Sequence, residues 1–359
     1  MEQPLSGLRV IDFSALLPGP LATLMLAEAG ADVIKVEKPG GDDMRRFAPQ
    51  LYGRGAVHRL LNDRKQIVEL DLKSEDGKAQ ATELVRSADV LVEQFRPGVM
   101  KRLGLDYPSM QGLNEQLIYC SITGYGQSGP RTFEAGHDIN YIGNTGLLAQ
   151  SWGSADNPVM PPAQIADIGG GSFPAVINIL LALLQRERTG QGCHLDIAMC
   201  DAMFAFALFA KAFAVSGEPV RNDGTGLLTG GSPRYGIYPA QCGTPICVGA
   251  LEEHFWQTLC DLLDISPQDR NDHDNPDHVR ACIAAAFRSR TAETWAPLLQ
   301  EADCCATVLK TIEDAMADPH FRERGLFDCP LDEIAGFVPA LPLPVAAPFR
   351  RSSDQGGPS

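Results

Sequence analysis

Short apolar runs typical of β-strands alternate with helical segments over residues 8–122, and this alternation constrains the fold more than any other feature of the chain. Strand-like runs lie at 8–13, 32–37, 66–72, 89–93 and 117–122, with helical patterns at 21–29 and 74–87. Strands separated by helices of this length are typical of parallel sheets, because a parallel pair needs a long crossover connection. The sequence therefore predicts an α/β fold, with a parallel sheet covered by helices on both faces.

The rest of the chain indicates a second, smaller domain. Two strongly apolar segments, 173–184 and 203–215, flank a strand-like run at 194–199. Helices that are apolar nearly all round must be buried, either in the core or between subunits. A Gly-rich hinge at 225–231 precedes an α+β region, and the Pro-, Ser- and Gly-rich tail 341–359 is expected to form a loose strap. We predict a large domain of residues 1–224, completed by 326–359, and a small domain of residues 225–325.

Charge and cysteine usage limit the partners and the compartment. The net charge of −15 disfavours nucleic acid or an anionic membrane as a partner of the whole surface. Residues 1–110 nevertheless hold 15 of the 30 Lys and Arg but only 16 of the 45 Asp and Glu, so a polyanionic small molecule has a candidate site there. Ten scattered cysteines without a CxxC pair indicate reduced thiols and a cytoplasmic protein.

No targeting or membrane segment is predicted. The apolar stretch 13–27 is interrupted by Pro18-Gly19-Pro20 and leads into a second strand, so we interpret it as a βα unit rather than a signal peptide. No apolar run is expected to reach the roughly 18–20 residues that span a bilayer. The prediction is that the protein does not associate with membranes.

Two motifs resemble ligand-binding signatures, but we favour a structural interpretation for each. Residues 124–129 match GxGxxG after a strand, but Pro130 and a polar stretch follow where a dinucleotide fingerprint needs a helix. The glycines are better explained by a loop that approaches a ligand closely. The Asp- and His-rich stretch 269–278 lacks the central Gly and terminal Glu of a calcium hand, so we interpret it as a solvated linker without a metal.

Three positions carry candidate acid or base groups. His137 and Asp138 lie in a polar loop, where such a pair is also a common surface feature. Asp167 precedes Gly169, Gly170 and Gly171 and an apolar helix, so it is either a helix cap or a reactive carboxylate whose neighbouring amides hold an oxyanion. Glu252 follows a strand of the small domain and is either structural or directed into a cleft.

Several of these segments occur together, in order, in one known family. They are Gly7–Asp12, Gly30–Glu37, Asn62–Lys65, Phe95–Gly98, Gly124–Pro130 and the GHDINY run at 136–141. Over residues 4–350 the chain resembles the family that contains α-methylacyl-CoA racemases and class III CoA-transferases. The resemblance implies a Rossmann-like large domain, a small domain and an interlocked homodimer. It also implies coenzyme A as part of the substrate and no separate cofactor.

The resemblance also implies roles for individual residues. The nucleotide or pantetheine would contact Lys38, the segment 66–70 (Gln66, Val68 and Leu70), Arg96, Arg102, Gly136 and Tyr141. Lys and Arg suit phosphate because they supply charge-assisted hydrogen bonds.

The reaction depends on the branch of the family. In the racemase hypothesis, His137 and Asp167 are paired acid/base groups. Glu252 orients the histidine, and Asp138 holds the loop in place. Amides near Asp167 and Gly169 would hold the enolate oxygen. In the transferase reading, Asp167 attacks the thioester and forms an acyl-enzyme anhydride. A non-catalytic acyl-CoA-binding protein is a third hypothesis. The presence of His137 and Glu252 favours a racemase or epimerase of 2-methylacyl-CoA.

Overall fold

The computed structural model describes residues 3–331 and 336–350. These residues group into two compact units. Unit 1 comprises residues 1–145, 162–206 and 319–359, and unit 2 comprises 146–161 and 207–318. Compactness alone does not define a domain that folds independently, so the predicted division into 1–224 with 326–359 and 225–325 stays a prediction.

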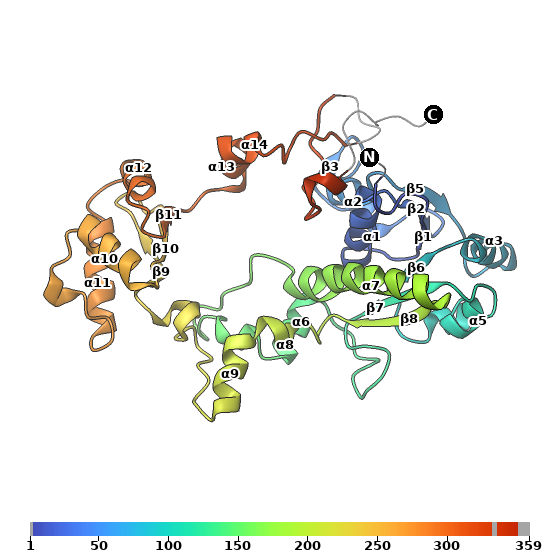
Figure 1. The fold of residues 1–359 in the computed structure, drawn as a ribbon, viewed down its shortest axis with the longest axis horizontal. Helices are drawn as coiled ribbons and strands as arrows, with labels where there is room; N and C mark the ends of the chain where they lie inside the picture. The colour runs from blue at the N-terminus through green and yellow to red at the C-terminus, as the bar shows by residue number, and fades with distance from the viewer. Residues whose placement is uncertain (1–2, 332–335, 351–359) are drawn as a thin grey trace. The chain divides into compact units, whose positions relative to one another are not determined.

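A parallel sheet forms the centre of unit 1 (Figure 1). Its 6 strands run in the order β5-β2-β1-β6-β7-β8, which is the doubly wound order of a Rossmann fold. The bounds are Arg9–Asp12 (β1), Asp32–Glu37 (β2), Gln66–Glu69 (β5), Val90–Glu93 (β6), Ile118–Thr123 (β7) and Cys193–Ala198 (β8). The predicted α/β class is confirmed, and a strand forms at each of these runs, although β7 ends one residue later and β8 begins one residue earlier than predicted.

The central strands are continuous apolar runs because helices cover both faces of the sheet. Every residue of β6 and β7 is buried, and Ile11 of β1 pairs in register with Ile34 and Leu91. Helices α1 and α7 contact one another and the sheet, whereas α3, α4 and α5 contribute to a separate core cluster. Their bounds are Pro18–Glu28 (α1), Glu75–Arg86 (α3), Val99–Leu103 (α4), Tyr107–Gln111 (α5) and Phe173–Thr189 (α7).

Smaller elements complete unit 1. A ribbon of Gln50–Leu51 (β3) and Arg54–Gly55 (β4) precedes Ala56–Asn62 (α2), while Asp138–Asn144 (α6), Met203–Phe206 (α8) and Pro319–Glu323 (α14) follow later in the chain. The segment expected to be a loose strap is partly anchored, since Leu343 is buried in a cluster with residues of α1 and α2. Residues 351–359 of that segment lie outside the described part of the chain.

Helix α1 begins earlier than the sequence predicted. The expected start was residue 21, after Pro18-Gly19-Pro20. The structure starts α1 at Pro18 and buries every residue of the helix. Proline is tolerated in the first turn because the amide it lacks has no partner there in any helix.

A π-helical stretch, Ala166–Ser172, leads directly into α7. Its glycines allow close packing: a Cβ on Gly170 would lie 2.2 Å from the carbonyl oxygen of Met199, and one on Gly171 would lie 2.9 Å from Cβ of Pro18. Because the two helical parts are continuous, Ala166–Thr189 reaches 24 residues, and a stretch of 18 residues within it has a mean hydropathy of 1.6. By length and composition this helix could cross a membrane, which the sequence analysis did not expect. Core helices of soluble proteins can have the same length and composition.

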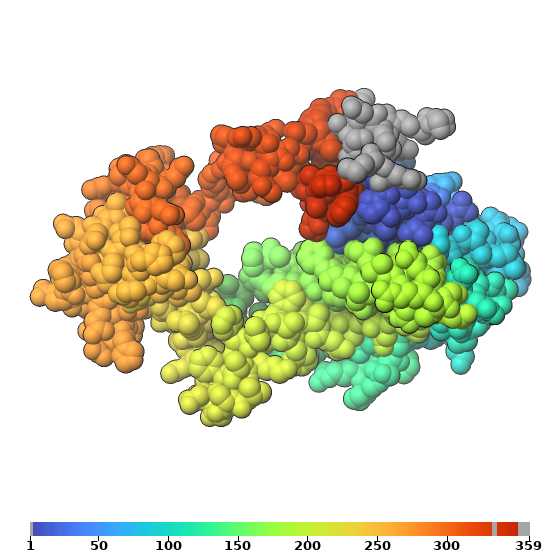
Figure 2. Space-filling model, viewed as in Figure 1, coloured from blue at the N-terminus to red at the C-terminus, as the bar shows by residue number. Residues whose placement is uncertain are grey.

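The outer face of helix α7 is not buried within the chain, although the sequence predicted burial either in the core or between subunits. Ile177, Leu181 and Leu184 are 56%, 57% and 55% exposed. Figure 2 shows the outer side of α7, in yellow-green, on the surface of unit 1. In unit 2, Leu208–Ser216 (α9) contains no buried residue. Of the two alternatives for these apolar segments, burial within the chain is therefore wrong for their outer faces.

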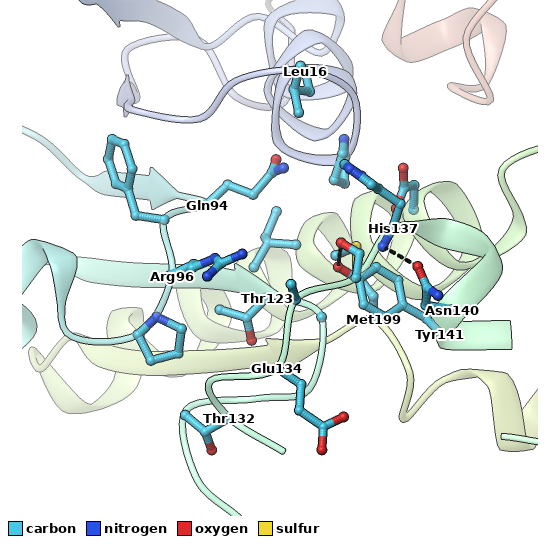
Figure 3. Close-up of a pocket in the computed structure, with 18 residues that line it drawn as sticks. Leu16, Gln94, Arg96, Thr123, Thr132, Glu134, His137, Asn140, Tyr141 and Met199 are labelled. Carbon is cyan, nitrogen blue, oxygen red and sulfur yellow. Dashed lines mark hydrogen bonds between the residues drawn. The ribbon is translucent and has the colours of Figure 1, made fainter. Parts of the chain in front are cut away.

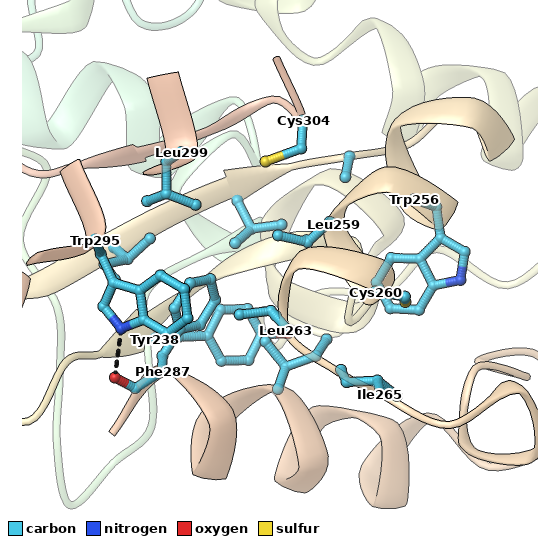
Figure 4. Packing of buried hydrophobic residues seen from close by; sticks show 14 of the residues in the cluster. Tyr238, Trp256, Leu259, Cys260, Leu263, Ile265, Phe287, Trp295, Leu299 and Cys304 are labelled. Atoms are coloured by element: carbon cyan, nitrogen blue, oxygen red, sulfur yellow. Dashed lines mark hydrogen bonds between the residues drawn. The ribbon is translucent and has the colours of Figure 1, made fainter. Parts of the chain in front are cut away.

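Unit 2 is an α+β unit with its own core (Figure 4). An antiparallel sheet runs in the order β11-β10-β9, and its core includes Trp256, Phe287 and Trp295. The indole of Trp295 donates a hydrogen bond to the carbonyl oxygen of Phe287 at 2.9 Å. The bounds are Tyr235–Pro239 (β9), Pro245–Gly249 (β10), Glu253–Leu262 (α10), Pro276–Phe287 (α11), Ala292–Ala302 (α12), Ala306–Val308 (β11) and Ile312–Ala317 (α13).

Candidate active site

A cavity of about 460 Å³ lies at the carboxyl edge of the parallel sheet. Leu16 and Pro18 follow β1, and Gln94 to Pro97 follow β6. These two neighbouring strands are the point where the strand order reverses, and open parallel sheets bind their ligands in the crevice at this point. His137 and Asp167 line the same cavity. The fold therefore brings both predicted reactive groups to the position where a ligand is expected.

Figure 3 shows the cavity with Gln94 and Arg96 on one side and His137, Asn140 and Tyr141 on the other. His137 immediately precedes α6, and its backbone amide donates to the side-chain oxygen of Asn140 at 3.0 Å. This contact is half of a capping box, which holds the first turn of a helix in place. The backbone of His137 is therefore ordered, while its side chain is exposed and able to meet a substrate.

Asp138 connects the histidine loop to the segment that carries Asp167. Its Oδ1 accepts hydrogen bonds from the backbone amides of Ala166, at 2.7 Å, and Asp167, at 2.9 Å. A carboxylate at the first amides of a helix is favoured by the helix dipole as well as by the hydrogen bonds. The prediction that Asp138 braces the loop thus has a geometric basis.

The surroundings of Asp167 favour its neutral form. Burial raises the pKa of this carboxyl to about 6, and the negative charge of Asp138 acts in the same direction, whereas His137 lowers the pKa. A carboxyl with this pKa exchanges protons readily near neutral pH. Asp167 is the second residue of the stretch Ala166–Ser172, whose N-cap is Ile165, so the structure does not place it as the helix cap.

The prediction that amides near Asp167 and Gly169 hold a substrate oxygen stays a prediction. Among these amides, that of Asp167 itself donates to Asp138. The sequence could not reveal this contact, because Asp138 and Asp167 are far apart in the chain and meet only through the fold. The amide of Gly169 stays a prediction for this role.

Three residues predicted to contact coenzyme A line the cavity: Arg96, Gly136 and Tyr141. The hydroxyl of Tyr141 donates to the carbonyl oxygen of Gly136 at 2.6 Å. A Cβ on Gly124 or Gly136 would lie 2.4 or 2.7 Å from the tyrosine ring, so both glycines make room for this ring. The GxGxxG match at 124–129 thus has a packing reason at its first glycine.

The other predicted coenzyme A contacts do not line the cavity. Lys38 is exposed and forms an ion pair with Asp43 at 2.8 Å, and Arg102 is an exposed residue of α4. Gln66 and Val68 belong to the edge strand β5, and Leu70 is 8% exposed in the core. Their roles stay predictions. Lys38, Leu70 and Arg96 follow β2, β5 and β6, so they all lie at the carboxyl edge of the sheet.

Glu252 is in unit 2, where it directly precedes α10 as the N-cap residue. Its side chain makes no capping hydrogen bond. Whether Glu252 is structural or directed into a cleft, and whether it orients His137, stay predictions.

Sequence reasoning missed several residues that line the cavity, including Gln94, Asn140 and Met199. Gln94 Oε1 accepts a hydrogen bond from the amide of Gly19 at 2.9 Å, so it connects the loop after β6 to the start of α1. Gln94 directly follows a predicted strand, and its place at a strand's carboxyl end was an available signal. Met199 directly follows β8 in the same way, so the same signal was available for it.

Comparison with known proteins agrees with this geometry. The sequence model of CoA-transferase family III matches residues 5–351. Alpha-methylacyl-CoA racemase of Homo sapiens is 33% identical over 330 residues, which cover 90% of this chain and 82% of the human protein. Succinate–glutarate CoA-transferase of Agrobacterium fabrum is 34% identical over 342 residues, which cover 90% of this chain and 84% of that protein.

The solved structure of a CAIB/BAIF family protein from Brucella suis superposes with a TM-score of 0.86 and 29% identity, covering 100% of this chain and 97% of that one. The similar proteins thus include both racemases and CoA-transferases, and the similarity extends over nearly the whole chain. The chain belongs to CoA-transferase family III, a family of enzymes that act as racemases or as CoA-transferases.

Proposed function

We propose that the protein is a racemase or epimerase of 2-methylacyl-CoA thioesters that needs no separate cofactor. The observation that carries the proposal is that His137 and Asp167 line one cavity and that Asp138 connects the segments bearing them. A transferase that uses Asp167 as its nucleophile has no need of a histidine at this position. Proton transfer at a thioester's α-carbon requires two groups of this kind.

The proposed chemistry is a proton transfer through an enolate. One base takes the α-proton, the electrons of the C–H bond move toward the thioester oxygen, and the other group protonates the opposite face of the carbon. The roles of His137 and Asp167 exchange for the opposite enantiomer. The pKa of about 6 for Asp167 suits a group that must both accept and return a proton near neutral pH.

Cation placement supports a coenzyme A thioester as the substrate. Arg96 lines the cavity, and Lys38 lies at the same carboxyl edge of the sheet. Phosphates bound along this edge would direct the acyl end toward the reactive pair. Two phosphate-binding cations outside the reacting centre would fix the substrate without taking part in the proton transfer.

A CoA-transferase is the second candidate, because relatives of similar identity carry that name. In that reaction the Asp167 carboxylate attacks the thioester carbonyl, the thiolate of coenzyme A leaves, and an acyl-aspartyl anhydride remains. A half-buried carboxylate in the cavity is compatible with this step as well.

Proton NMR in deuterated buffer separates the two candidates. A single enantiomer of a 2-methylacyl-CoA is incubated with the wild type and with His137→Ala, using His273→Asn, an exposed histidine of unit 2, as the matched control. We expect deuterium to enter the α-position with loss of configuration, and this exchange to disappear in His137→Ala alone. The transferase would be established instead if the α-proton is retained even with many equivalents of enzyme and if hydroxylamine traps acyl-Asp167.

We also propose that the protein is a homodimer, as the family resemblance implies. The exposed apolar side chains of α7 support this, because monomeric proteins rarely leave contiguous apolar faces uncovered. A second copy of the chain is the occupant we propose for this face.

A further inference from the structure

We propose that Asp269, His278 and Cys282 form a binding site in unit 2 for a divalent cation of the zinc class. A carboxylate oxygen, an imidazole nitrogen and the thiol sulfur of these residues all lie within 4.8 Å of one another. His278 Nε2 lies 2.8 Å from Asp269 Oδ1 and 3.6 Å from Cys282 Sγ. The site is independent of the proposed reaction.

The donor set matches the chemistry of zinc. Zinc binds nitrogen, sulfur and carboxylate oxygen at about 2.0–2.3 Å, so tetrahedral ligand atoms lie roughly 3.3–3.8 Å apart. The sulfur–nitrogen separation already falls in this range, and a small rotation of Asp269 would open the oxygen–nitrogen separation. A thiol together with an imidazole disfavours calcium and magnesium, which prefer oxygen ligands.

The backbone around the site is ordered. His278 and Cys282 are four residues apart on α11, so they project from the same face of the helix. The next stripe of that helix, Val279, Ile283 and Phe287, is buried in the core of unit 2. The two ligands on α11 are therefore held by a packed helix rather than by a mobile loop.

Asp269 is positioned by contacts that leave one oxygen for a cation. Ser266 Oγ donates to Asp269 Oδ2 at 2.7 Å, whereas Oδ1 is the oxygen that faces His278. Hydrogen bonds from neighbouring groups to a metal-binding carboxylate are a regular feature of protein metal sites. The backbone beyond Asp269 is fixed as well, because the indole of Trp256 donates to the carbonyl oxygen of Arg270 at 3.2 Å.

The local charge does not oppose a cation. The guanidinium of Arg270 adjoins Asp269 in sequence but bonds Asp261 at 2.6 Å and Gln257 at 2.7 Å. Asp272 and Asp274 follow in the same stretch, and the guanidinium of Arg234 is engaged by both carboxylate oxygens of Asp272 at 2.9 Å. Three protein ligands leave a fourth position for water, so a bound ion would clamp the 266–275 stretch onto α11. Cys282 lies outside the stretch 269–278, so the sequence of that stretch alone does not contain the full set of proposed ligands.

Cobalt(II) is the probe that tests the proposal. The full-length protein is stripped with a chelator and titrated with Co²⁺, then with Zn²⁺. We expect a thiolate-to-cobalt charge-transfer band and the visible bands of tetrahedral cobalt, with saturation at a single equivalent and displacement by zinc. Cys282→Ser should abolish the charge-transfer band, and Ser266→Ala should weaken binding by roughly 10-fold.

Two matched variants control for other ligands. Cys242→Ser removes an exposed cysteine of unit 2, and His273→Asn removes an exposed histidine beside Asp274; both should retain the full cobalt spectrum. Circular dichroism checks that every variant is folded. A wild-type titration without a charge-transfer band, or a band that survives Cys282→Ser, would overturn the proposal.

Discussion

The carboxylate of Asp138 accepts a hydrogen bond from the backbone amide of Asp167 at 2.9 Å. The loop that carries the proposed base His137 is therefore joined directly to the helix that carries Asp167. The contact has two consequences. It fixes the start of the π-helical segment, and it places a negative charge beside Asp167 that helps to raise the pKa of that carboxyl. Asp138 therefore contributes both to the geometry and, together with burial, to the proton affinity of the candidate site.

Asp138→Asn should shift the pH dependence of the reaction. The amide oxygen can still accept the hydrogen bonds, but the negative charge is gone, so the pKa of Asp167 should fall below about 6 while burial still holds it above its ordinary value. The acidic limb of kcat/KM for α-proton exchange should therefore move to lower pH. Asp106→Asn, at the start of α5, is the control and should leave the limb in place. An unmoved limb in Asp138→Asn contradicts the electrostatic coupling.

Gly170→Ala should destabilise unit 1. The new Cβ would lie 2.2 Å from a backbone carbonyl oxygen, and overpacking of this kind costs about 1–3 kcal/mol. Gly143→Ala is the matched control: nothing lies within 4 Å of its Cβ, and alanine is the better helix former in α6. Urea unfolding of both variants measures the difference. Equal stabilities would show that the close approach of Met199 does not constrain this helix.

The buried pair of Asp12 and Lys65 should make stability depend on alkaline pH. Burial lowers the pKa of Lys65 to about 7, from its ordinary value of 10.5. Between these values the unfolded chain binds more protons than the folded one, so the free energy of unfolding should rise as pH rises from about 7 toward 10. Lys65→Met should remove this contribution. Urea titrations across this range measure it, and parallel curves for wild type and variant would refute it.

Glu93 should produce the opposite trend at acidic pH. Burial raises the pKa of this carboxyl to about 7, from 4.5. The folded chain then binds more protons between these values, so stability should fall as pH rises from 4.5 to about 7 and stay level above. Glu93→Gln should flatten the curve while keeping an acceptor for the amide of Phe95, which Glu93 holds at 2.8 Å. A curve that keeps its slope in the variant assigns the effect to another group.

Leu181→Glu should test the proposed dimer. This side chain is 57% exposed on α7, and a charge in an apolar interface carries a large desolvation cost. Light scattering should show a dimer for the wild type and a shift toward monomer for the variant. Leu113→Glu, at an exposed leucine after α5, should remain dimeric. A wild type that is monomeric at high concentration would refute the proposal.

Local patterns predicted the elements of the fold well, for reasons that the structure makes clear. Strands β6 and β7 are buried on both faces, so their sequences are mostly apolar and are easily recognised as strands. The start of α1 was misplaced, because proline is tolerated in a first turn. The outer face of α7 was expected to be buried, because its apolar pattern does not distinguish a core from a surface that a second chain would cover.

Strand alternation and collinear motifs follow the order of the chain, so the parallel sheet, the family and the candidate pair His137 and Asp167 could be predicted from the residues alone. Which side chains meet could not be predicted in this way. Asp138 reaches the amide of Asp167, Gln94 reaches Gly19, and Met199 joins the cavity, although each contact spans a long stretch of chain. The physical reason is that the carboxyl ends of parallel strands converge on one edge, which brings distant loops together in a way that local sequence does not encode.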